Sequence, residues 1–319
     1  MKNVLLNADR VKKPVILGTD WHMDVDDVVA LRILAWAHKK EIIKLLGVSI
    51  DSAMEYSVSS LRAVTENEGI PDVSIGFDHG AFDYGGPGKY QERLARGRDA
   101  KSENDNCESA LKMYRRLLSE SDEKVDIIEV GFSQVLADLL MSGADEYSPL
   151  DGVSLVKEKV SKLWIMGGRW NMPNGKEFNF AYAPKASRGI CKVLELCPVP
   201  ITFLGWEVGY NVISGTVLKD TYPEDILHLA ICDFNAPNNT VGRPSWDPLT
   251  AYMACVGDEE ACGYSTVRGT AQVDPNTGLN NFVEDANGPH VYVVKKHSEA
   301  EYAECIDEIL LLQAKEIYG

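Results

Sequence analysis

Residues 16–30 read ILGTDWHMDVDDVVA, and this stretch passes from an apolar run through a charged turn into a second apolar segment. The residues before Asp20 predict a buried strand, whereas residues 26–40 space their apolar side chains by three and four, as a helix does. Four aspartates stand in or beside the turn, with no lysine or arginine among them: Asp20, Asp24, Asp26 and Asp27. The junction of the predicted strand and helix therefore concentrates negative charge.

Short apolar runs alternate with helical patterns along the rest of the chain. Further strands are predicted at residues 43–50, 72–77, 125–132, 162–168 and 199–205. Strands that are apolar over most of their length are typical of a mostly parallel sheet covered on both faces. We therefore predict one α/β domain over residues 1–319, with an αβα layered fold around a mostly parallel mixed sheet. Residues 78–106, rich in Gly, Asp, Arg and Asn, are predicted to form a long mobile loop.

Charge and cysteine content narrow the class of protein. The formal net charge of −16 argues against nucleic acid and anionic membranes as partners, since both need a basic surface. Seven cysteines without a C-x-x-C pair favour free thiols in a reducing compartment. No apolar run approaches the length of a membrane span. We expect a cytoplasmic protein that acts on a small molecule.

The aspartate turn has two explanations. Asp26 or Asp27 alone would be explained as a helix cap, because the amino end of a helix favours negative charge. Four crowded carboxylates, however, raise one another's pKa and destabilise the fold unless a cation lies among them. A hard divalent ion such as Ca²⁺ binds carboxylate and carbonyl oxygens. Since ligands bind at the carboxyl ends of parallel strands, we expect a cation site here.

Two later segments carry polar residues in similar positions. Residues 165–180, IMGGRWNMPNGKEFNF, follow a strand end with amides and a carboxylate that suit a polyhydroxylated ligand. Taken alone, they are better explained as a turn whose Asn side chains satisfy its own backbone. Residues 243–252, RPSWDPLTAY, place Asp247 where a helix begins.

Together and in this order, the three segments resemble the nucleoside hydrolase family, of the inosine–uridine-preferring type and its relatives. TDWHMDVDDVVAL is similar to the family's aspartate cluster in its longer-loop form, TDxGxDxDD. GGRWNMPNGKEFNF is similar to its ribose-binding segment, and SWDPLTAY to the segment with its last metal-binding aspartate. GFSQVLADLL is a weaker match to the Gly-Pro-Leu-Thr-Asn-Leu-Ala loop. The resemblance extends from residue 14 to about residue 257.

The resemblance implies a Ca²⁺-dependent enzyme that hydrolyses the N-glycosidic bond of ribonucleosides to ribose and free base, assembled as a homodimer or homotetramer. It makes Asp20 the general base and a metal ligand, and Asp26 a ligand of the ribose hydroxyls. The other implied metal ligands are Asp27, Asp247 and, through its main-chain carbonyl, Gln134. The other implied sugar contacts are Asn171, Glu177, Asn179 and Met166.

The chain departs from the family pattern at several of these positions. Trp21-His22 replaces the usual Pro-Gly in a turn two residues longer, so Asp24 competes with Asp20 and Asp26 for a role as base or ligand. His22 becomes a candidate acid or gate. Asp51 stands where the family has a Gly-Asn loop, and is a candidate substrate contact.

The part of the site that would contact the departing base has two possible interpretations. Trp246 stands where the family often has a histidine that protonates the departing base; an indole can instead stack on a purine, which favours purine nucleosides. Plain core packing would explain Trp246 equally well. The protein would alternatively hydrolyse another ribosyl compound, or bind a sugar through a metal without turnover.

Overall fold

A large twisted sheet organises the fold. The computed structural model describes residues 1–22, 24–183, 185–238 and 241–319. Within these residues, one ten-stranded sheet has the order β11 (Asn280–Glu284), β10 (Tyr264–Val273), β12 (His290–Lys295), β7 (Ile201–Leu204), β6 (Val160–Met166), β5 (Val125–Glu129), β1 (Lys13–Thr19), β2 (Ile43–Ile50), β3 (Ser74–Phe77) and β4 (Glu108–Ser109). Strand β10 runs antiparallel to both β11 and β12, and the remaining neighbours are parallel. The predicted mostly parallel mixed sheet is confirmed.

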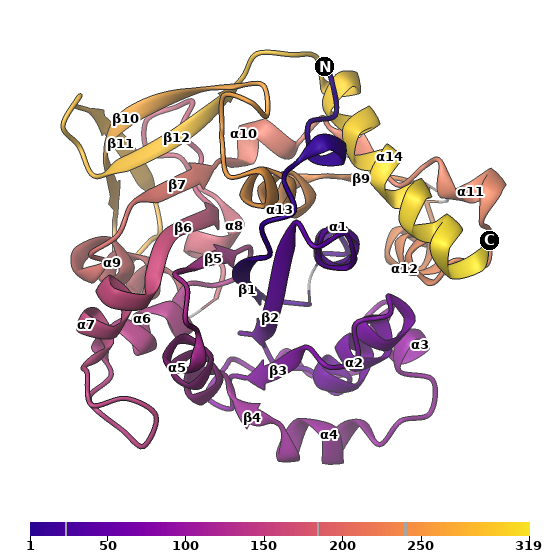
Figure 1. Cartoon of the computed structure of the whole chain (residues 1–319), viewed down its shortest axis with the longest axis horizontal. Helices are drawn as coiled ribbons and strands as arrows, with labels where there is room; N and C mark the ends of the chain where they lie inside the picture. The colour runs from indigo at the N-terminus through magenta and orange to yellow at the C-terminus, as the bar shows by residue number, and fades with distance from the viewer. Residues whose placement is uncertain (23, 184, 239–240) are drawn as a thin grey trace.

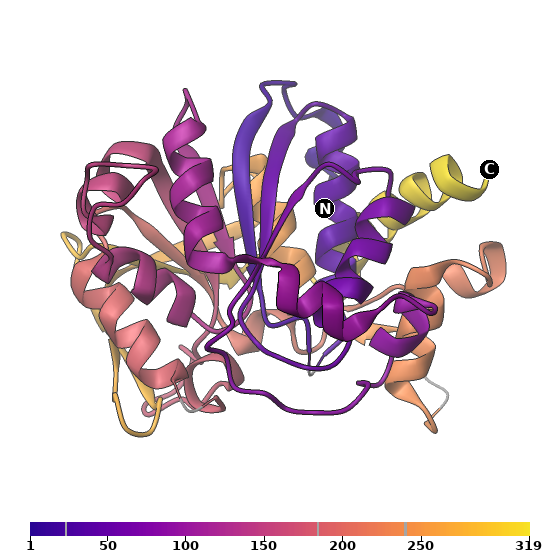
Figure 2. The ribbon, with the colours of Figure 1, turned by 90° about the horizontal axis from the view of Figure 1, so that it is seen from below.

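Helices cover both faces of this sheet (Figure 1). One apolar core joins the sheet to α1 (Asp26–Lys39), α2 (Ser57–Asn67), α12 (Ile226–Asn235), α13 (Trp246–Val256) and α14 (Glu299–Tyr318). The other core joins it to α5 (Ala110–Glu120), α6 (Gln134–Met141), α7 (Gly152–Lys159) and α9 (Ala186–Leu196). Figure 2 shows α1 and α5 on opposite sides of β1 and β2. The predicted αβα layering is confirmed.

Shorter elements connect the layers. They are η1 (Leu5–Asn7), α3 (Gln91–Ala95), α4 (Ala100–Asn106), α8 (Phe178–Ala181), α10 (Trp206–Gly209), α11 (Leu218–Thr221), and the two-stranded ribbon β8 (Ile213–Ser214) and β9 (Arg243–Pro244). Among the described helices, none is long and apolar enough to cross a bilayer.

Helix α1 is the central helix of one layer. All of its residues from Asp26 to Ala37 are buried, because β2, α13 and α14 pack against it. A helix covered on several sides needs apolar residues around most of its circumference, which the sequence VVALRILAWA provides. The close packing of α1 on α13 brings the first turn of each helix together, so Asp26 and Asp27 lie near Asp247.

One charged residue of α1 lies in this core. The side chain of Arg32 is fully buried between two buried carboxylates. Its Nη1 donates to Asp225 Oδ2 at 2.6 Å, and its Nε donates to Glu68 Oε1 at 2.8 Å. The paired charges hold α1 against the end of α2 and the start of α12, and the two carboxylates raise the pKa of the guanidinium.

The structure differs from the predicted long loop over residues 78–106, because this segment is not one continuous loop. It contains α3 and α4, and Tyr90, Gln91 and Leu94 are buried. Helix α4 begins where the Asp99 carboxylate accepts a hydrogen bond from the Ser102 amide at 3.1 Å, an ordinary N-cap. The polar composition of the segment concealed these short helices, since neither is long enough to show a periodic pattern.

Candidate functional site

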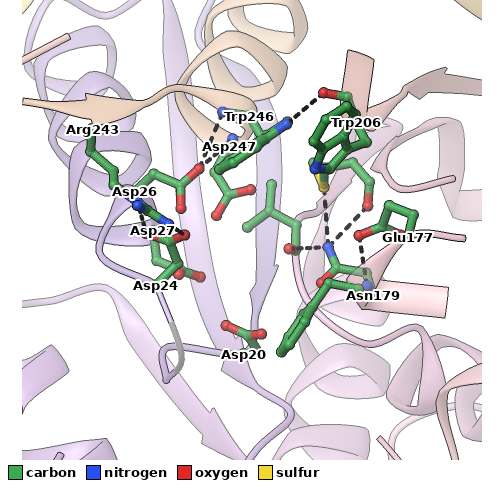
Figure 3. Close-up of a pocket in the computed structure, with 13 residues that line it drawn as sticks. Asp20, Asp24, Asp26, Asp27, Glu177, Asn179, Trp206, Arg243, Trp246 and Asp247 are labelled. Carbon is green, nitrogen blue, oxygen red and sulfur yellow. Dashed lines mark hydrogen bonds and ion pairs between the residues drawn. The ribbon is translucent and has the colours of Figure 1, made fainter. Parts of the chain in front are cut away.

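A cavity of about 300 Å³ opens where the parallel strands end. Its walls come from the turn between β1 and α1, the ends of β5 and β6, and the starts of α8, α10 and α13 (Figure 3). We call it the carboxylate pocket, and it is lined by Asp20, Asp24, Asp26, Asp27, Val130, Met166, Glu177, Phe178, Asn179, Trp206, Arg243, Trp246 and Asp247. The structure therefore brings together most of the residues that the three sequence segments singled out.

Three buried carboxylates form the floor of the pocket. One oxygen from each of Asp26, Asp27 and Asp247 lies within 4.8 Å of the others. Asp26 Oδ2 accepts the amides of Trp246 at 3.2 Å and of Asp247 at 3.1 Å, so the start of α13 is fastened to the start of α1. The Thr19 hydroxyl donates to Asp27 Oδ1. Backbone and neighbouring groups thus fix the trio in place.

A bound positive charge would relieve the repulsion among these three carboxylates. Burial first, and then repulsion from neighbouring aspartates, raises the pKa of each of Asp26, Asp27 and Asp247 well above its usual range. No described lysine or histidine lines the pocket, and its one arginine is bonded to Asp24. An all-oxygen set of buried, mutually repelling carboxylates suits a hard divalent cation. The residues present therefore fit the implied Ca²⁺.

Asp20 lies at the end of β1, beside the trio and outside its 4.8 Å cluster. Burial raises its pKa to about 8, and Asp26 and Asp24 add to the rise. Trp21 follows in the left-handed conformation, with φ of 45°, which is strained for a bulky residue and is typical of functional sites. The Trp21 indole is buried and donates to Ser60 Oγ at 2.9 Å, which locks the turn.

The backbone of Asp20 is also held from below. The Ser52 hydroxyl donates to the Asp20 carbonyl. A Cβ on Gly131 would lie 2.3 Å from the Asp20 amide nitrogen, so only glycine permits this approach of the β5 end to the β1 end. Asp20 is therefore a rigidly mounted carboxylate that faces the cavity.

The opposite wall is polar and well ordered by hydrogen bonds. Glu177 accepts the amides of Asn179 at 2.7 Å, Gly168 at 3.0 Å and Phe180 at 3.2 Å, so it caps α8. Burial raises the pKa of Glu177 to about 7. Asn179 Nδ2 donates to the carbonyl of Val130 at 2.8 Å, which directs the amide group across the pocket.

Two indoles form an aromatic wall beside the trio. Trp246 Nε1 donates to the Trp206 carbonyl at 2.7 Å, and both rings line the cavity. A Cβ on Gly209 would lie 2.5 Å from Trp246 Cδ1, so the ring can lie there only against a glycine. Trp246 is half-buried, and it both packs against one apolar core and lines the cavity.

Asp24 lines the pocket as a member of an ion pair. Arg243 Nε donates to Asp24 Oδ1 at 2.6 Å, and Nη2 donates to Asp24 Oδ2. The Val25 amide adds a bond of 2.6 Å to Asp24 Oδ1. Both carboxylate oxygens of Asp24 therefore accept hydrogen bonds, and Arg243 balances its charge.

Two of the expected sugar and metal contacts lie outside the pocket. Asn171 is exposed on the turn after β6 and does not line the cavity. The Gln134 side chain donates to the Asp51 carbonyl at 2.7 Å and to Asp78 Oδ2 at 2.9 Å, in the first turn of α6. From the β5 end, Val130 lines the pocket in place of Gln134. The role of the Gln134 main-chain carbonyl as a metal ligand stays a prediction.

His22 and Asp51 are also displaced from the cavity wall. The His22 ring stacks on Tyr84 with 3.9 Å between ring centroids, and burial lowers its pKa to about 4, so it is neutral at pH 7. Asp51 is buried beside Glu129 under the end of β1; burial, then Glu129 and Asp20, raise its pKa. Neither side chain is among the residues that line the pocket, so the contacts expected of them stay predictions.

Sequence reasoning missed four lining residues and one supporting acid. Val130, Phe178, Trp206 and Arg243 carry no recognisable chemistry in the sequence, although Phe178 and Arg243 stand within segments that were singled out. Glu129 lies under the pocket, and burial raises its pKa to about 8. The one available signal for Glu129 was an acid inside the apolar run VDIIEV.

Comparison with known proteins adds the fold's relatives. No family model matches the chain, and no curated protein matches its sequence. Among solved structures, it is similar to the inosine-uridine preferring nucleoside hydrolase from Bacillus anthracis, with TM-score 0.66, 17% identity, and coverage of 95% of this chain and 99% of that chain.

Two further structures resemble the chain to the same degree. An inosine-guanosine nucleoside hydrolase gives TM-score 0.70, 13% identity, and coverage of 94% and 99%. The type III effector protein XopQ, complexed with adenosine diphosphate ribose, gives TM-score 0.67, 16% identity, and coverage of 99% and 97%. The chain thus has the nucleoside hydrolase fold.

Proposed function

We propose that this protein is a Ca²⁺-dependent hydrolase of ribonucleoside N-glycosidic bonds, with a preference for purine nucleosides. The observation that carries the proposal is the trio of Asp26, Asp27 and Asp247, buried without a cation of the chain's own, on one side of a cavity whose other side is Glu177 and Asn179. The fold shared with nucleoside hydrolases supports the same activity.

Glycosidic cleavage needs a water molecule to attack one face of the sugar while positive charge develops on the ring. Asp20 would take the proton of that water, because its carboxylate is rigidly held and faces the cavity. A calcium ion bound by the trio would hold the ribose hydroxyls and make water more acidic. With the ion present, its charge would lower the raised pKa of Asp20 and keep it ionised as a base.

The sugar would be held from the opposite wall. The Asn179 amide and the Glu177 carboxylate present oxygens that accept hydrogen bonds from hydroxyl groups. An ionised Glu177 would also stabilise positive charge on the ring as the bond breaks. Met166 and Phe178 would exclude water from the ribose, which strengthens these interactions.

Trp246 would stack on the departing base and favour the larger purine ring. Base–aromatic stacking contributes about 1–3 kcal/mol per base, so Trp246→Ala should lower kcat/KM for inosine about tenfold or more. Uridine offers a smaller ring and should lose less. Better turnover of uridine than of inosine by the unchanged protein would contradict the purine preference.

The direct test is a substrate panel with the calcium-loaded protein. Reducing sugar and free base are measured after incubation with inosine, guanosine, adenosine and uridine, and again after the ion is removed with EDTA. We expect stoichiometric release of ribose and base that EDTA abolishes and added Ca²⁺ restores. Binding of nucleosides by calorimetry without any release would contradict the proposed hydrolysis and indicate a sugar-binding protein.

A second candidate is hydrolysis or binding of another ribosyl compound, which the similarity to a protein complexed with adenosine diphosphate ribose favours. Adding that compound to the panel separates the two candidates. The nucleoside proposal predicts a kcat/KM for inosine well above the value for adenosine diphosphate ribose.

A further inference from the structure

Arg243 is the one basic side chain among the described lining residues of the carboxylate pocket. It stands in β9, four residues before Asp247, and Asp24 fixes its guanidinium through two parallel hydrogen bonds. Such a fork holds both the charge and the plane of the group. The guanidinium also lies over Phe234, 4.7 Å from the ring centroid, and 5.9 Å from that of Trp246. Arg243 is therefore positioned from three sides.

Part of this guanidinium remains free for a ligand. Nε and Nη2 are used by Asp24, whereas no hydrogen bond to any described residue engages Nη1. The side chain is about a quarter exposed, and it faces the cavity. A free donor of a fixed cation inside a pocket is suited to an acceptor or to developing negative charge.

The position of Arg243 indicates which end of a substrate it would meet. Figure 3 shows Arg243 and Asp24 on one side of the trio, and Glu177 and Asn179 on the other. The guanidinium lies 5.9 Å from the ring centroid of Trp246, the side chain on which the proposed function places the departing base. The fixed cation therefore lies on the leaving-group side.

We propose that Arg243, held by Asp24, stabilises the departing base and sets its class: bases with an acceptor at position 6, such as the 6-oxopurines, are preferred over adenine. This inference rests on the proposed function. The C1′–N bond breaks with its electron pair on the base, water supplies the oxygen that joins C1′, and Asp20 takes the proton of that water. Arg243 keeps its proton and offers a hydrogen bond, and the base nitrogen takes a proton from solvent.

The chemical reason for the preference is donor and acceptor matching. A 6-oxopurine presents O6 and N7, both acceptors, and the free Nη1 of Arg243 can donate to this edge. Adenine presents an amino group at position 6, and its hydrogens would oppose those of the guanidinium. Since Trp246 is not an acid, a charged donor beside it provides help to the leaving group that stacking alone cannot give.

The test compares natural and activated substrates in Arg243→Gln. The p-nitrophenyl riboside has a leaving group that departs as a stable anion and needs little assistance. We expect kcat/KM for inosine to fall on the order of 100-fold, with the fall mainly in kcat, while the value for the p-nitrophenyl riboside changes less than about threefold. The ratio of inosine to adenosine turnover should fall as well. Arg93→Gln, which removes an arginine paired with Asp233 outside the pocket, should leave all three substrates unchanged.

Arg243→Lys is a second test variant, in case Arg243→Gln does not fold. It keeps the charge and loses the fork, so inosine turnover should lie between those of the wild type and Arg243→Gln. Equal losses on inosine and the p-nitrophenyl riboside, or no loss on either, would overturn the inference and make the ion pair structural. A wild-type protein that releases ribose from none of the substrates would instead refute the proposed function.

Discussion

Two clusters of buried carboxylates lie beside helix α1, one near its middle and one at its start, and they differ in how their charge is balanced. Near the middle of α1, Arg32 neutralises Glu68 and Asp225 through short hydrogen bonds. At the start of α1, Asp26 and Asp27 face Asp247, and among the described lining residues the one basic side chain is bonded to Asp24 instead. Arg32 balances the charge of the first cluster, whereas the trio of Asp26, Asp27 and Asp247 remains available for a cation from solution. The contrast separates a structural use of buried charge from a functional one.

The largest effect is expected from neutralising the pocket acid nearest the reacting water. Asp20→Asn should reduce kcat by on the order of 10³–10⁴, because the isosteric amide cannot accept the proton. The variant should keep its circular dichroism spectrum, since the contact between Ser52 and Asp20 is made by the Asp20 backbone. Asp233→Asn, at a surface acid of α12, is the matched control and should keep full activity. Activity of Asp20→Asn near the wild-type rate would remove Asp20 from the mechanism.

Removing the cation of the other cluster should affect stability first. Arg32→Met leaves Glu68 and Asp225 buried without compensation, so the free energy of unfolding should fall by about 3–5 kcal/mol. Arg62→Met, which breaks an exposed pair with Glu103, should cost about 1 kcal/mol or less. Urea denaturation of the two variants measures the difference. Equal losses would mean that the Arg32 cluster is no more important than a surface ion pair.

The pocket should also make the ion-free protein sensitive to alkali. The pKa of Asp20 is about 8 in the folded chain and 3.8 as an ordinary value, so the folded state binds its proton more tightly than the unfolded state. This contribution to stability is complete below about pH 4 and is lost as the pH rises through 8. In EDTA, the free energy of unfolding should therefore fall between about pH 5 and about pH 9, and saturating Ca²⁺ should reduce that fall. A fall of the same size with Ca²⁺ would argue against an ion among these carboxylates.

The smallest effect is expected from one acid of the trio in the absence of the ion. The Asp247 carboxylate accepts no hydrogen bond from the described residues, and its neighbours repel it. Asp247→Asn should therefore stabilise the EDTA-treated protein, by about 1 kcal/mol, as relief of strain at functional sites commonly does. Destabilisation of the EDTA-treated variant would show that repulsion within the trio is already relieved.

The sequence predicted the sheet, the layers and most of the pocket, because these depend on apolar runs and on strand ends. The sequence places four aspartates in the pocket because each stands just after a strand or in the first turn of a helix: Asp20, Asp26, Asp27 and Asp247. Small errors in the predicted element boundaries do not change this placement. Gln134 is not among the lining residues, and from the end of β5 it is Val130 that lines the pocket. The sequence pattern marks a strand end but does not determine which of the next residues reaches the cavity.

Other features of the site depend on contacts between distant segments. The bond from Arg243 to Asp24 joins residues 219 positions apart, and nothing local in either segment indicates it. His22 is predicted to lie near the pocket because it stands between Asp20 and Asp24 in the sequence. In the structure, the strained turn at Trp21 places the His22 ring against Tyr84. Tertiary packing, rather than local composition, determines where such residues lie.

The most direct measurement is a calorimetric titration of the EDTA-treated, dialysed protein with Ca²⁺, carried out in parallel on Asp247→Asn. The account predicts one high-affinity ion per wild-type chain and loss of that site in the variant. Absence of binding to the wild type, or undiminished binding to Asp247→Asn, would contradict the claim that the unpartnered carboxylates form a cation site.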